Sequence, residues 1–266
     1  MGPTEHKKLE LKTAAEIEAI REAGQILHAV IEEVAAQVRP GITPIDLDRI
    51  AKGLILEAGA KPAFENLYGF PKTLCTAIND AVVHGIPRKV DLQEGDVISI
   101  DCGVKYNGFF ADMATTVAVG EVRTEVARLM EVTKKSLYLG IEQCWPGKRL
   151  GDIGHAIQTF VEGEGFHVIE GYGGHGLGRN PHEDPHIENK GQPGKGKRLK
   201  TGMVLAIEPM IAIGTGQTVT LDDNWTVLTA DGSIAAHYEH TVAVTEQGPR
   251  ILTLPQEALV EMGLSR

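Results

Sequence analysis

The chain has 266 residues, of which 42% are hydrophobic and 23% charged, and its formal net charge is −10. This length and composition are typical of a globular protein with a full core, and the negative charge argues against a surface that binds nucleic acid or anionic membrane as a whole. The three cysteines lack CxxC spacing, so neither a disulfide framework nor a zinc ribbon is indicated.

The N-terminal stretch MGPTEHKKLE has no apolar signal-peptide core. No stretch of the chain approaches the roughly 20 apolar residues that are needed to span a bilayer. Gly2 suggests myristoylation, but His6 stands where that motif needs Ser or Thr. We therefore expect a cytoplasmic protein without a membrane partner.

Three helices are predicted from apolar residues at three- and four-residue steps. The first covers residues 14–38 and ends before Pro40 and Gly41. The other two cover residues 122–143 and 151–163. Since antiparallel strands are predicted between them, we expect an α+β domain.

Asn107-Gly108 is a strong hairpin signal, because both central positions of a type I′ turn need positive φ. It predicts paired antiparallel strands over residues 97–106 and 109–118. One face of this hairpin is apolar, as a core requires. Its residues are Ile98, Ile100, Cys102, Val104, Phe109, Ala111, Met113 and Val117.

Two aspartates share the other face of the hairpin. The register places Asp101 opposite Ala114, so that Asp112 is a diagonal neighbour of Asp101 at a backbone separation of about 7–8 Å. Two close carboxylates beside a buried sheet repel each other unless a cation lies between them. The alternative is a pair of solvated aspartates on an edge hairpin, and this segment alone leaves both open.

An internal repeat relates the two halves of the chain. EGDVISID at 94–101 matches TGMVLAIE at 201–208, and residues 40–60 match residues 146–166 at nearly the same offset. Each half then runs helix, helix and a strand with an acidic residue at its end. We expect a site where the halves meet.

The repeat places Glu208 where Asp101 stands in the first half, and Pro209 discourages a regular ladder beyond it. Residues 237–244 alternate as one predicted strand, which places Glu239 on the same face as His237. A single glutamate of this kind is usually an exposed, solvated side chain, and this alternative applies to each of the two taken alone. Four such carboxylates in one chain are harder to explain in that way.

Residues 171–186 are expected to form a glycine-rich loop that carries His175 and His182. Asn180-Pro181 breaks the chain where a dinucleotide motif needs a helix, so we exclude that motif. The Gly-Lys segment at 191–198 lacks the Ser or Thr of a phosphate loop. It is interpreted as a solvated loop, with a ribosome or RNA contact as the alternative.

Asp101, Asp112, Glu208, Glu239 and one histidine would provide mostly oxygen ligands with a single nitrogen. This ligand set suits a divalent Mn, Fe, Co or Zn ion better than it suits a structural zinc, which favours thiolates and imidazoles. Four carboxylates would over-neutralise one dication. Two metals about 3.5–4 Å apart would balance the charge and activate a shared water.

Five motifs occur along the chain in the order FPKTLCTAINDAVVHGIP, SIDCGVKYNGFFADMATT, GGHGLGRNPHEDP, GMVLAIEPM and NWTVLTADGSIAAHYEHT. With these motifs the chain resembles type I methionine aminopeptidases of peptidase family M24 from about residue 10 to 253. The resemblance implies the pita-bread fold of creatinases and aminopeptidases, in which an antiparallel sheet with two pseudo-two-fold related halves is covered by helices.

Carried over by position, the resemblance implies five ligands for two divalent metal ions per chain. Asp101 would be a bidentate ligand of one metal, and His175 and Glu208 would be ligands of the other. Asp112 and Glu239 would bridge the two ions.

The resemblance also implies removal of the initiator methionine when the second residue is small. A hydroxide that bridges the metals would attack the methionine carbonyl, and Glu208 would pass protons between that water and the departing amine. His182 would hydrogen-bond the substrate carbonyl. His84, which as a lone histidine in a turn would otherwise be read as structural, would contact the scissile amide nitrogen.

A pocket for the methionine side chain follows from the same resemblance. Phe70, Cys75 and Trp225 match residues that are familiar in the family. Three further apolar residues depart from it, where the family often has Cys or Pro, Tyr and Phe. They are Phe64, Leu67 and Pro181.

We expect a flexible N-terminus at residues 1–10, a single catalytic metallopeptidase domain at 11–253 with halves of about 11–118 and 119–253, and a C-terminal tail at 254–266. The expected partners are nascent polypeptides, with a transient ribosome contact, and the expected state is a monomer. Prolidases, aminopeptidases P and creatinases usually carry an extra N-terminal domain, for which 266 residues leave no room. A catalytically dead binding protein would have lost metal ligands, and all five are present.

Overall fold

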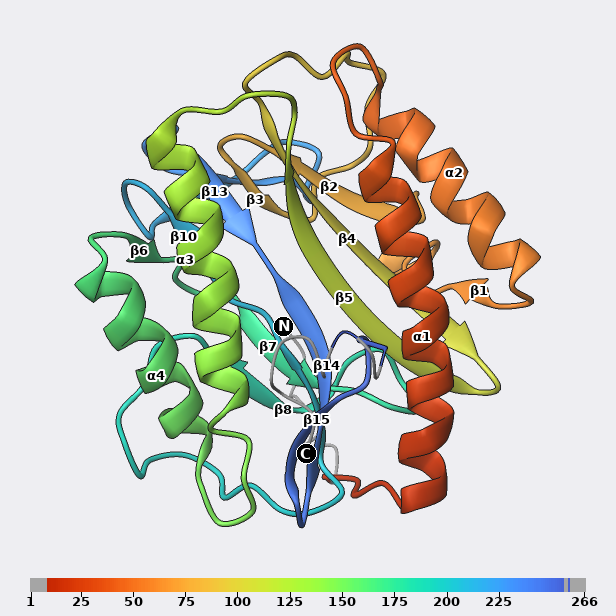
Figure 1. The fold of residues 1–266 in the computed structure, drawn as a ribbon, viewed down its shortest axis with the longest axis vertical. Helices are drawn as coiled ribbons and strands as arrows, with labels where there is room; N and C mark the ends of the chain where they lie inside the picture. The colour runs from red at the N-terminus through yellow and green to blue at the C-terminus, as the bar shows by residue number, and fades with distance from the viewer. Residues whose placement is uncertain (1–8, 256–257, 259–266) are drawn as a thin grey trace.

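The computed structural model describes residues 9–255 and residue 258, so most of the expected N-terminus and C-terminal tail lies outside the described residues. Figure 1 shows the arrangement of the elements. The helices are α1 (Ala14–Ala36), α2 (Pro44–Glu57), the short 3-10 helix η1 (Leu67–Gly69), α3 (Thr124–Ile141) and α4 (Leu150–Gly163). The strands are β1 (Lys61–Pro62), β2 (Leu74–Ile78), β3 (Ala81–Val83), β4 (Val97–Tyr106), β5 (Phe109–Ala118), β6 (His167–Val168), β7 (Gly173–Gly176), β8 (Glu183–Glu188), β9 (Val204–Ile207), β10 (Met210–Ala212), β11 (Thr218–Thr220), β12 (Val227–Thr229), β13 (Ala235–His237), β14 (Glu239–Thr245) and β15 (Gly248–Ile251).

The predicted helices are confirmed, with ends that differ from the prediction by at most two residues. The start of α1 is fixed by Thr13 and Glu16, which form a capping box, and the start of α2 by the side chain of Thr43. Among the described helices, none combines the length and the apolar character needed to cross a membrane.

The predicted hairpin is confirmed in its strand ends and its register. Asp101 pairs with Ala114, as the two-residue turn requires. Asn107 and Gly108 adopt φ values of 47° and 86°, which is the left-handed backbone that a type I′ turn needs. Asp112 pairs with Gly103, so the two aspartates are diagonal neighbours.

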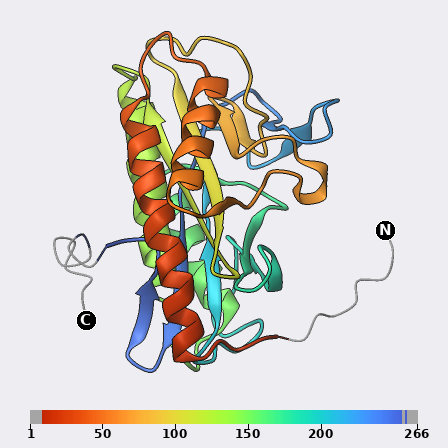
Figure 2. The same cartoon turned by 90° about the vertical axis from the view of Figure 1, so that its right-hand side faces the viewer.

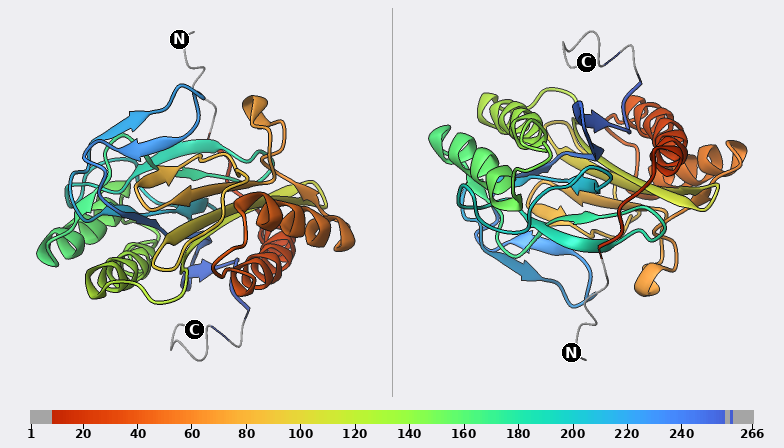
Figure 3. Two further views of the ribbon diagram at one scale, coloured as in Figure 1. Left: turned by 90° about the horizontal axis from the view of Figure 1, so that it is seen from above. Right: turned by 90° about the horizontal axis from the view of Figure 1, so that it is seen from below.

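A nine-stranded sheet connects the two halves of the molecule. Its order is β1-β4-β5-β14-β9-β7-β8, with β2 also paired to β4 and β15 to β14, and every pairing is antiparallel. Helices α1 to α4 lie on one face of this sheet, and the hairpin of β11 and β12 lies on the other (Figures 2 and 3). Strand β14 lies between β5 of the first half and β9 of the second.

Each pair of helices packs on its own part of the sheet. One core cluster joins α1 and α2 to β4 through residues such as Leu27, Leu47 and Ile98. A second joins α3 and α4 to β9 and β14 through residues such as Ile157 and Leu205. Because burial of each of these side chains contributes about 1.5–3 kcal/mol, the helix layer holds both halves of the sheet in place.

The prediction of one continuous strand over residues 237–244 is wrong. β13 pairs with β10 in a small sheet, whereas β14 pairs with β9 and β5 in the large one. Between them Tyr238 leaves the ladder, and its hydroxyl donates to the backbone oxygen of Thr116 at 2.9 Å. The hydroxyl of Thr116 donates to the His237 oxygen at 2.8 Å and so takes the place of a ladder bond.

The predicted alternation of faces holds within β14. His240 points away from Glu239, toward the helix layer, where its Nε2 lies 3.2 Å from the Tyr138 hydroxyl. Its Nδ1 lies 2.9 Å from the Thr253 hydroxyl. The His240 side chain is therefore hydrogen-bonded at both ring nitrogens.

The glycine-rich loop expected over residues 171–186 is in fact two paired strands, β7 and β8. A Cβ on Gly174 would lie 2.1 Å from the Ala206 oxygen, and one on Gly176 would lie 2.3 Å from the Asp184 oxygen. The glycines therefore serve close strand packing, because they lack the side-chain atom that would separate the backbones.

A buried ion pair fixes the turn between β7 and β8. Lys12, whose side chain is only 2% exposed, donates to Glu183 Oε2 at 2.6 Å. The other carboxylate oxygen of Glu183 accepts from the backbone N–H groups of Arg179 and Asn180, both at 2.9 Å. These contacts tie the turn that carries His182 to the segment before α1.

We expect Gly174→Ala to lower the free energy of unfolding by about 1–3 kcal/mol, because the added Cβ must push β7 away from β9. The matched control is Gly53→Ala in α2, where an added Cβ meets nothing within 4 Å. That change should raise the free energy of unfolding by about 0.5–1 kcal/mol. Urea denaturation measures both, and equal stability of the two variants would show that the close approach is no constraint.

Replacing Lys12 with Met leaves Glu183 without its cation in a buried position. We expect Lys12→Met to lower the free energy of unfolding by about 3–5 kcal/mol. Lys52→Met removes a comparable pair with Glu65 at 2.7 Å, but those side chains are 42% and 31% exposed, so a loss below about 1 kcal/mol is expected there. Similar losses for both variants in thermal or urea denaturation would contradict the special role of the buried pair.

Candidate metal centre and its pocket

Five neighbouring positions of the large sheet supply the residues that the sequence predicted as metal ligands. Asp101 lies on β4, Asp112 on β5 and His175 on β7. Glu208 follows the last residue of β9, and Glu239 is the first residue of β14. The sheet order therefore brings residues that lie far apart in the sequence into one place.

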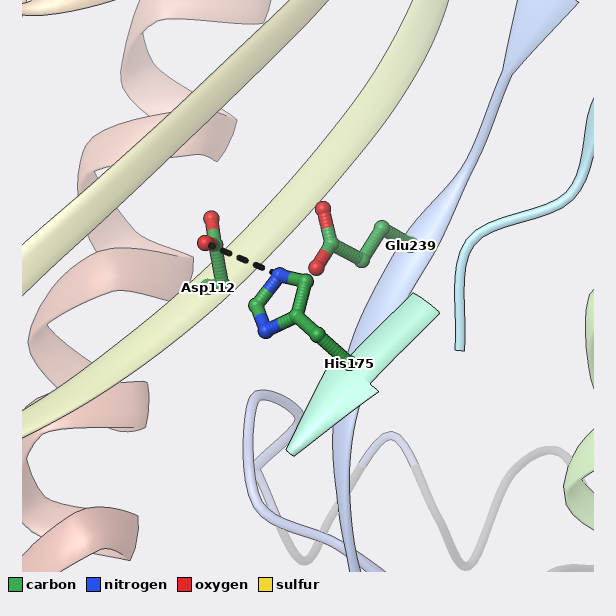
Figure 4. A group of neighbouring side chains, drawn as sticks. All are labelled: Asp112, His175 and Glu239. Atoms are coloured by element: carbon green, nitrogen blue, oxygen red, sulfur yellow. Dashed lines mark ion pairs between the residues drawn. The ribbon is translucent and has the colours of Figure 1, made fainter. Parts of the chain in front are cut away.

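The side chains of Asp112, His175 and Glu239 point toward one another (Figure 4). One potential ligand atom from each of the three lies within 4.8 Å of the others. His175 Nε2 is 4.0 Å from Asp112 Oδ2 and 3.6 Å from Glu208 Oε1. These are separations at which the atoms could share a cation.

A second group consists of Glu208, His237 and Glu239, again with ligand atoms within 4.8 Å of one another. His237 Nε2 lies 3.7 Å from Glu208 Oε2. Sequence reasoning did not select His237, although its predicted alternation with Glu239 on one face was the signal that could have done so. Asp101 belongs to neither group, but it lines the same cavity.

The carboxyl groups of the site have strongly perturbed acidity. Burial, followed by repulsion from neighbouring carboxylates, holds the pKa of Asp101, Glu208 and Glu239 well above the usual range. Burial raises the pKa of Asp112 to about 7, although the Met113 N–H donates to its carboxylate. Without a cation, these groups therefore retain protons near neutral pH.

The histidines are shifted in the opposite direction. Burial, with a further contribution from His182, lowers the pKa of His175 to about 3. Burial and then His84 lower the pKa of His237 to about 3. Both imidazoles are therefore neutral at physiological pH, which is the form that binds a metal.

Several buried polar atoms in the site have no hydrogen-bond partner among the described residues. They are Asp101 Oδ1, Glu239 Oε1 and His237 Nε2. Each unsatisfied group of this kind costs about 1–3 kcal/mol. Divalent cations would satisfy all three, and carboxylate oxygens with imidazole nitrogens suit Mn, Fe, Co or Zn. The residues present therefore fit a metal centre.

A cavity of about 460 Å³ opens onto these ligands. One of its walls is apolar and consists of the five pocket residues predicted from the sequence: Phe64, Leu67, Phe70, Cys75 and Trp225. The rings of Phe70 and Trp225 meet edge to face with centroids 5.1 Å apart. Pro181, which was also expected near the pocket, is not among the residues that line the cavity.

His84 and His182 both line the cavity. His84 follows β3 with a left-handed φ of 58°, and its ring contacts Trp225 and Tyr172. The ring centroid of His182 is 4.4 Å from that of His175. Desolvation lowers the pKa of both, so each is neutral and can donate one hydrogen bond.

Comparisons with known proteins identify the family of the chain. The model of metallopeptidase family M24 matches residues 18–246. Over 244 residues the chain is 50% identical to a methionine aminopeptidase of Clostridium perfringens, with 92% of this chain and 98% of that protein covered. The solved structures of methionine aminopeptidases from Rickettsia prowazekii and Thermotoga maritima match with a TM-score of 0.92 each, at 39% and 42% identity. Both matches cover 93% of this chain and 100% of the solved one. The chain therefore belongs to metallopeptidase family M24 and, within it, to the methionine aminopeptidases.

Proposed function

We propose that this protein removes the N-terminal methionine from peptides and nascent proteins whose second residue is small. The observation that carries the proposal is the single cavity that combines unpartnered buried carboxylates with an apolar wall. The carboxylates provide for a metal-dependent hydrolysis, and the wall provides for a methionine side chain. The relatives named methionine aminopeptidase support the same activity.

Two metal ions are proposed, because the four buried carboxylates of the site would over-neutralise a single dication. Asp101 would bind one ion, His175 and Glu208 would bind the other, and Asp112 and Glu239 would be shared between them. When bound, the ions supply Lewis acidity, which acidifies the attacking water and polarises the peptide carbonyl.

The side chains around the ions have separate tasks. Glu208 would carry a proton from the attacking water to the departing amine, since its carboxylate borders both histidines of the ligand groups. His182 would donate a hydrogen bond to the substrate carbonyl as negative charge develops on its oxygen. His84, which also lines the cavity, would contact the scissile nitrogen.

The apolar wall would hold the thioether of methionine. Phe64, Phe70 and Cys75 are buried, and Leu67 and Trp225 pack against them. A thioether is polarizable and makes favourable contacts with aromatic rings, so this wall suits methionine better than a charged side chain. We further expect a monomer that contacts the ribosome only transiently, which cosedimentation would test.

The activity is tested by the release of free methionine from Met-Gly-Met-Met and Met-Leu-Met-Met. We expect cleavage of the first peptide only, and only after Mn²⁺, Co²⁺ or Fe²⁺ has been added to metal-free protein. If folded protein cleaves neither peptide with any metal, the chain would have to be a binding protein on the same fold.

Glu239→Gln tests the shared ligand. We expect kcat to fall by at least about 100-fold, because a carboxamide cannot bridge two cations. The same change should make the metal-free protein more stable at pH 7.5, since it removes a carboxyl group whose pKa is raised by burial and which must therefore bind a proton on folding. Glu188→Gln at the exposed end of β8 is the control, for which neither quantity should change. Wild-type turnover by Glu239→Gln would exclude the shared-ligand role.

Metal binding should release protons, because the carboxyl groups of the metal-free site hold protons that a cation must displace. Asp112 has a pKa of about 7, so its contribution to proton release should decline as the pH rises through that value. The apparent affinity for Mn²⁺ should rise over the same range. Calorimetric titrations in buffers of different ionisation enthalpy measure the number of protons, and a binding heat that is independent of the buffer at pH 6 would contradict the prediction.

A further inference from the structure

Tyr68 has an unusual position at the edge of the cavity. The residue is 75% exposed, although large aromatic residues usually lie buried. Its backbone is left-handed, with φ 52° and ψ 18°. Asn66 and Gly69 beside it also have positive φ, but both of those residue types tolerate this conformation, whereas a tyrosine is strained by it.

The turn that carries Tyr68 is held rigidly by its own backbone. The Asn66 N–H donates to the Phe70 oxygen at 2.8 Å, and the Leu67 N–H donates to the Phe64 oxygen at 2.9 Å. Because the turn is closed on both sides, Tyr68 at its tip cannot relax without breaking these bonds. Strain that the surrounding structure maintains in this way is typical of functional sites.

The ring of Tyr68 lies beside that of His182 at the cavity. It is stacked on His182 with centroids 5.9 Å apart and an angle of 27° between the planes. His182 in turn lies 4.4 Å from His175. The three rings therefore form a series from the metal ligands to solvent, and Tyr68 is its outer member and also lines the cavity.

We propose that Tyr68 is a specificity-determining residue that binds the third residue of the peptide substrate. This inference rests on the proposed function, which places the methionine side chain against the apolar wall and the scissile bond beside His182. An extended peptide advances about 3.3 Å per residue, so the distance from His182 to Tyr68 corresponds to about two residues. The exposed face of the ring is then available to an apolar or aromatic side chain at the third position.

The test removes the ring while the backbone conformation is retained. Tyr68→Asn substitutes a residue that accepts left-handed φ, and Tyr68→Phe keeps the ring without its hydroxyl. Leu56→Gln removes another exposed apolar side chain, which lies on α2 and outside the cavity lining. Each protein is assayed with Met-Gly-Met-Met, which has a third residue, and with Met-Gly amide, which has none.

For Tyr68→Asn we expect kcat/KM to fall about two- to tenfold with Met-Gly-Met-Met, the size of effect of one aromatic contact, mainly through KM. With Met-Gly amide it should change by less than about twofold. Tyr68→Phe and Leu56→Gln should match the wild type with both substrates. Release of the backbone strain should also raise the melting temperature of Tyr68→Asn by about 2 °C.

Two results would overturn the inference. Unchanged kinetics of Tyr68→Asn with Met-Gly-Met-Met would mean that the ring does not touch the substrate. An equal loss with both substrates would mean that Tyr68 acts only by orienting His182. Failure of the metal-loaded wild type to cleave either substrate would instead reject the proposed function, so the two failures are distinguishable.

Discussion

Four carboxylates that face one cavity repel one another and are costly to bury, and the rest of this structure can be understood from that constraint. No single strand could hold them so close, because side chains on one face of a strand are separated by two residues. The protein instead takes them from separate strands of one sheet and places β14 at the seam between the halves. The helices behind the sheet resist the repulsion, since they pack both halves into continuous apolar clusters.

On the pocket side of the sheet, β7 lies unusually close to its neighbouring strands. Gly174 and Gly176 let β7 lie against its neighbours without side chains between them, which brings His175 to the carboxylates. The ion pair of Lys12 and Glu183 then fixes the turn that follows, and with it His182. His84 and Tyr68, which both have a positive φ, line the same cavity. The free energy gained by packing of the helices thus offsets the backbone strain on the pocket side of the sheet.

Much of the fold and of the candidate site was predictable from the sequence, because the signals are local. Asn107-Gly108 determines the hairpin register and therefore the relation of Asp101 to Asp112. The internal repeat then identifies Glu208. Pairing between distant segments leaves no such local signal. The β7–β8 ladder was hidden because its glycines resemble those of a loop, and the separation of β13 from β14 depends on a hydrogen bond from Tyr238 to a strand more than a hundred residues away. The strained position of Tyr68 likewise depends on the three-dimensional turn around it.

The pairing of β14 also bears on how the chain avoids a misfolded site. Glu239 lines the cavity, whereas the next residue, His240, faces the helices. A shift of β14 by one residue would exchange the two faces and present an imidazole to the cavity in place of a carboxylate. Tyr138 and Thr253 contact both ring nitrogens of His240, so such a shift would break two hydrogen bonds on the helix side of the sheet. These contacts therefore fix the register of β14 from the side of the sheet that the cavity does not touch.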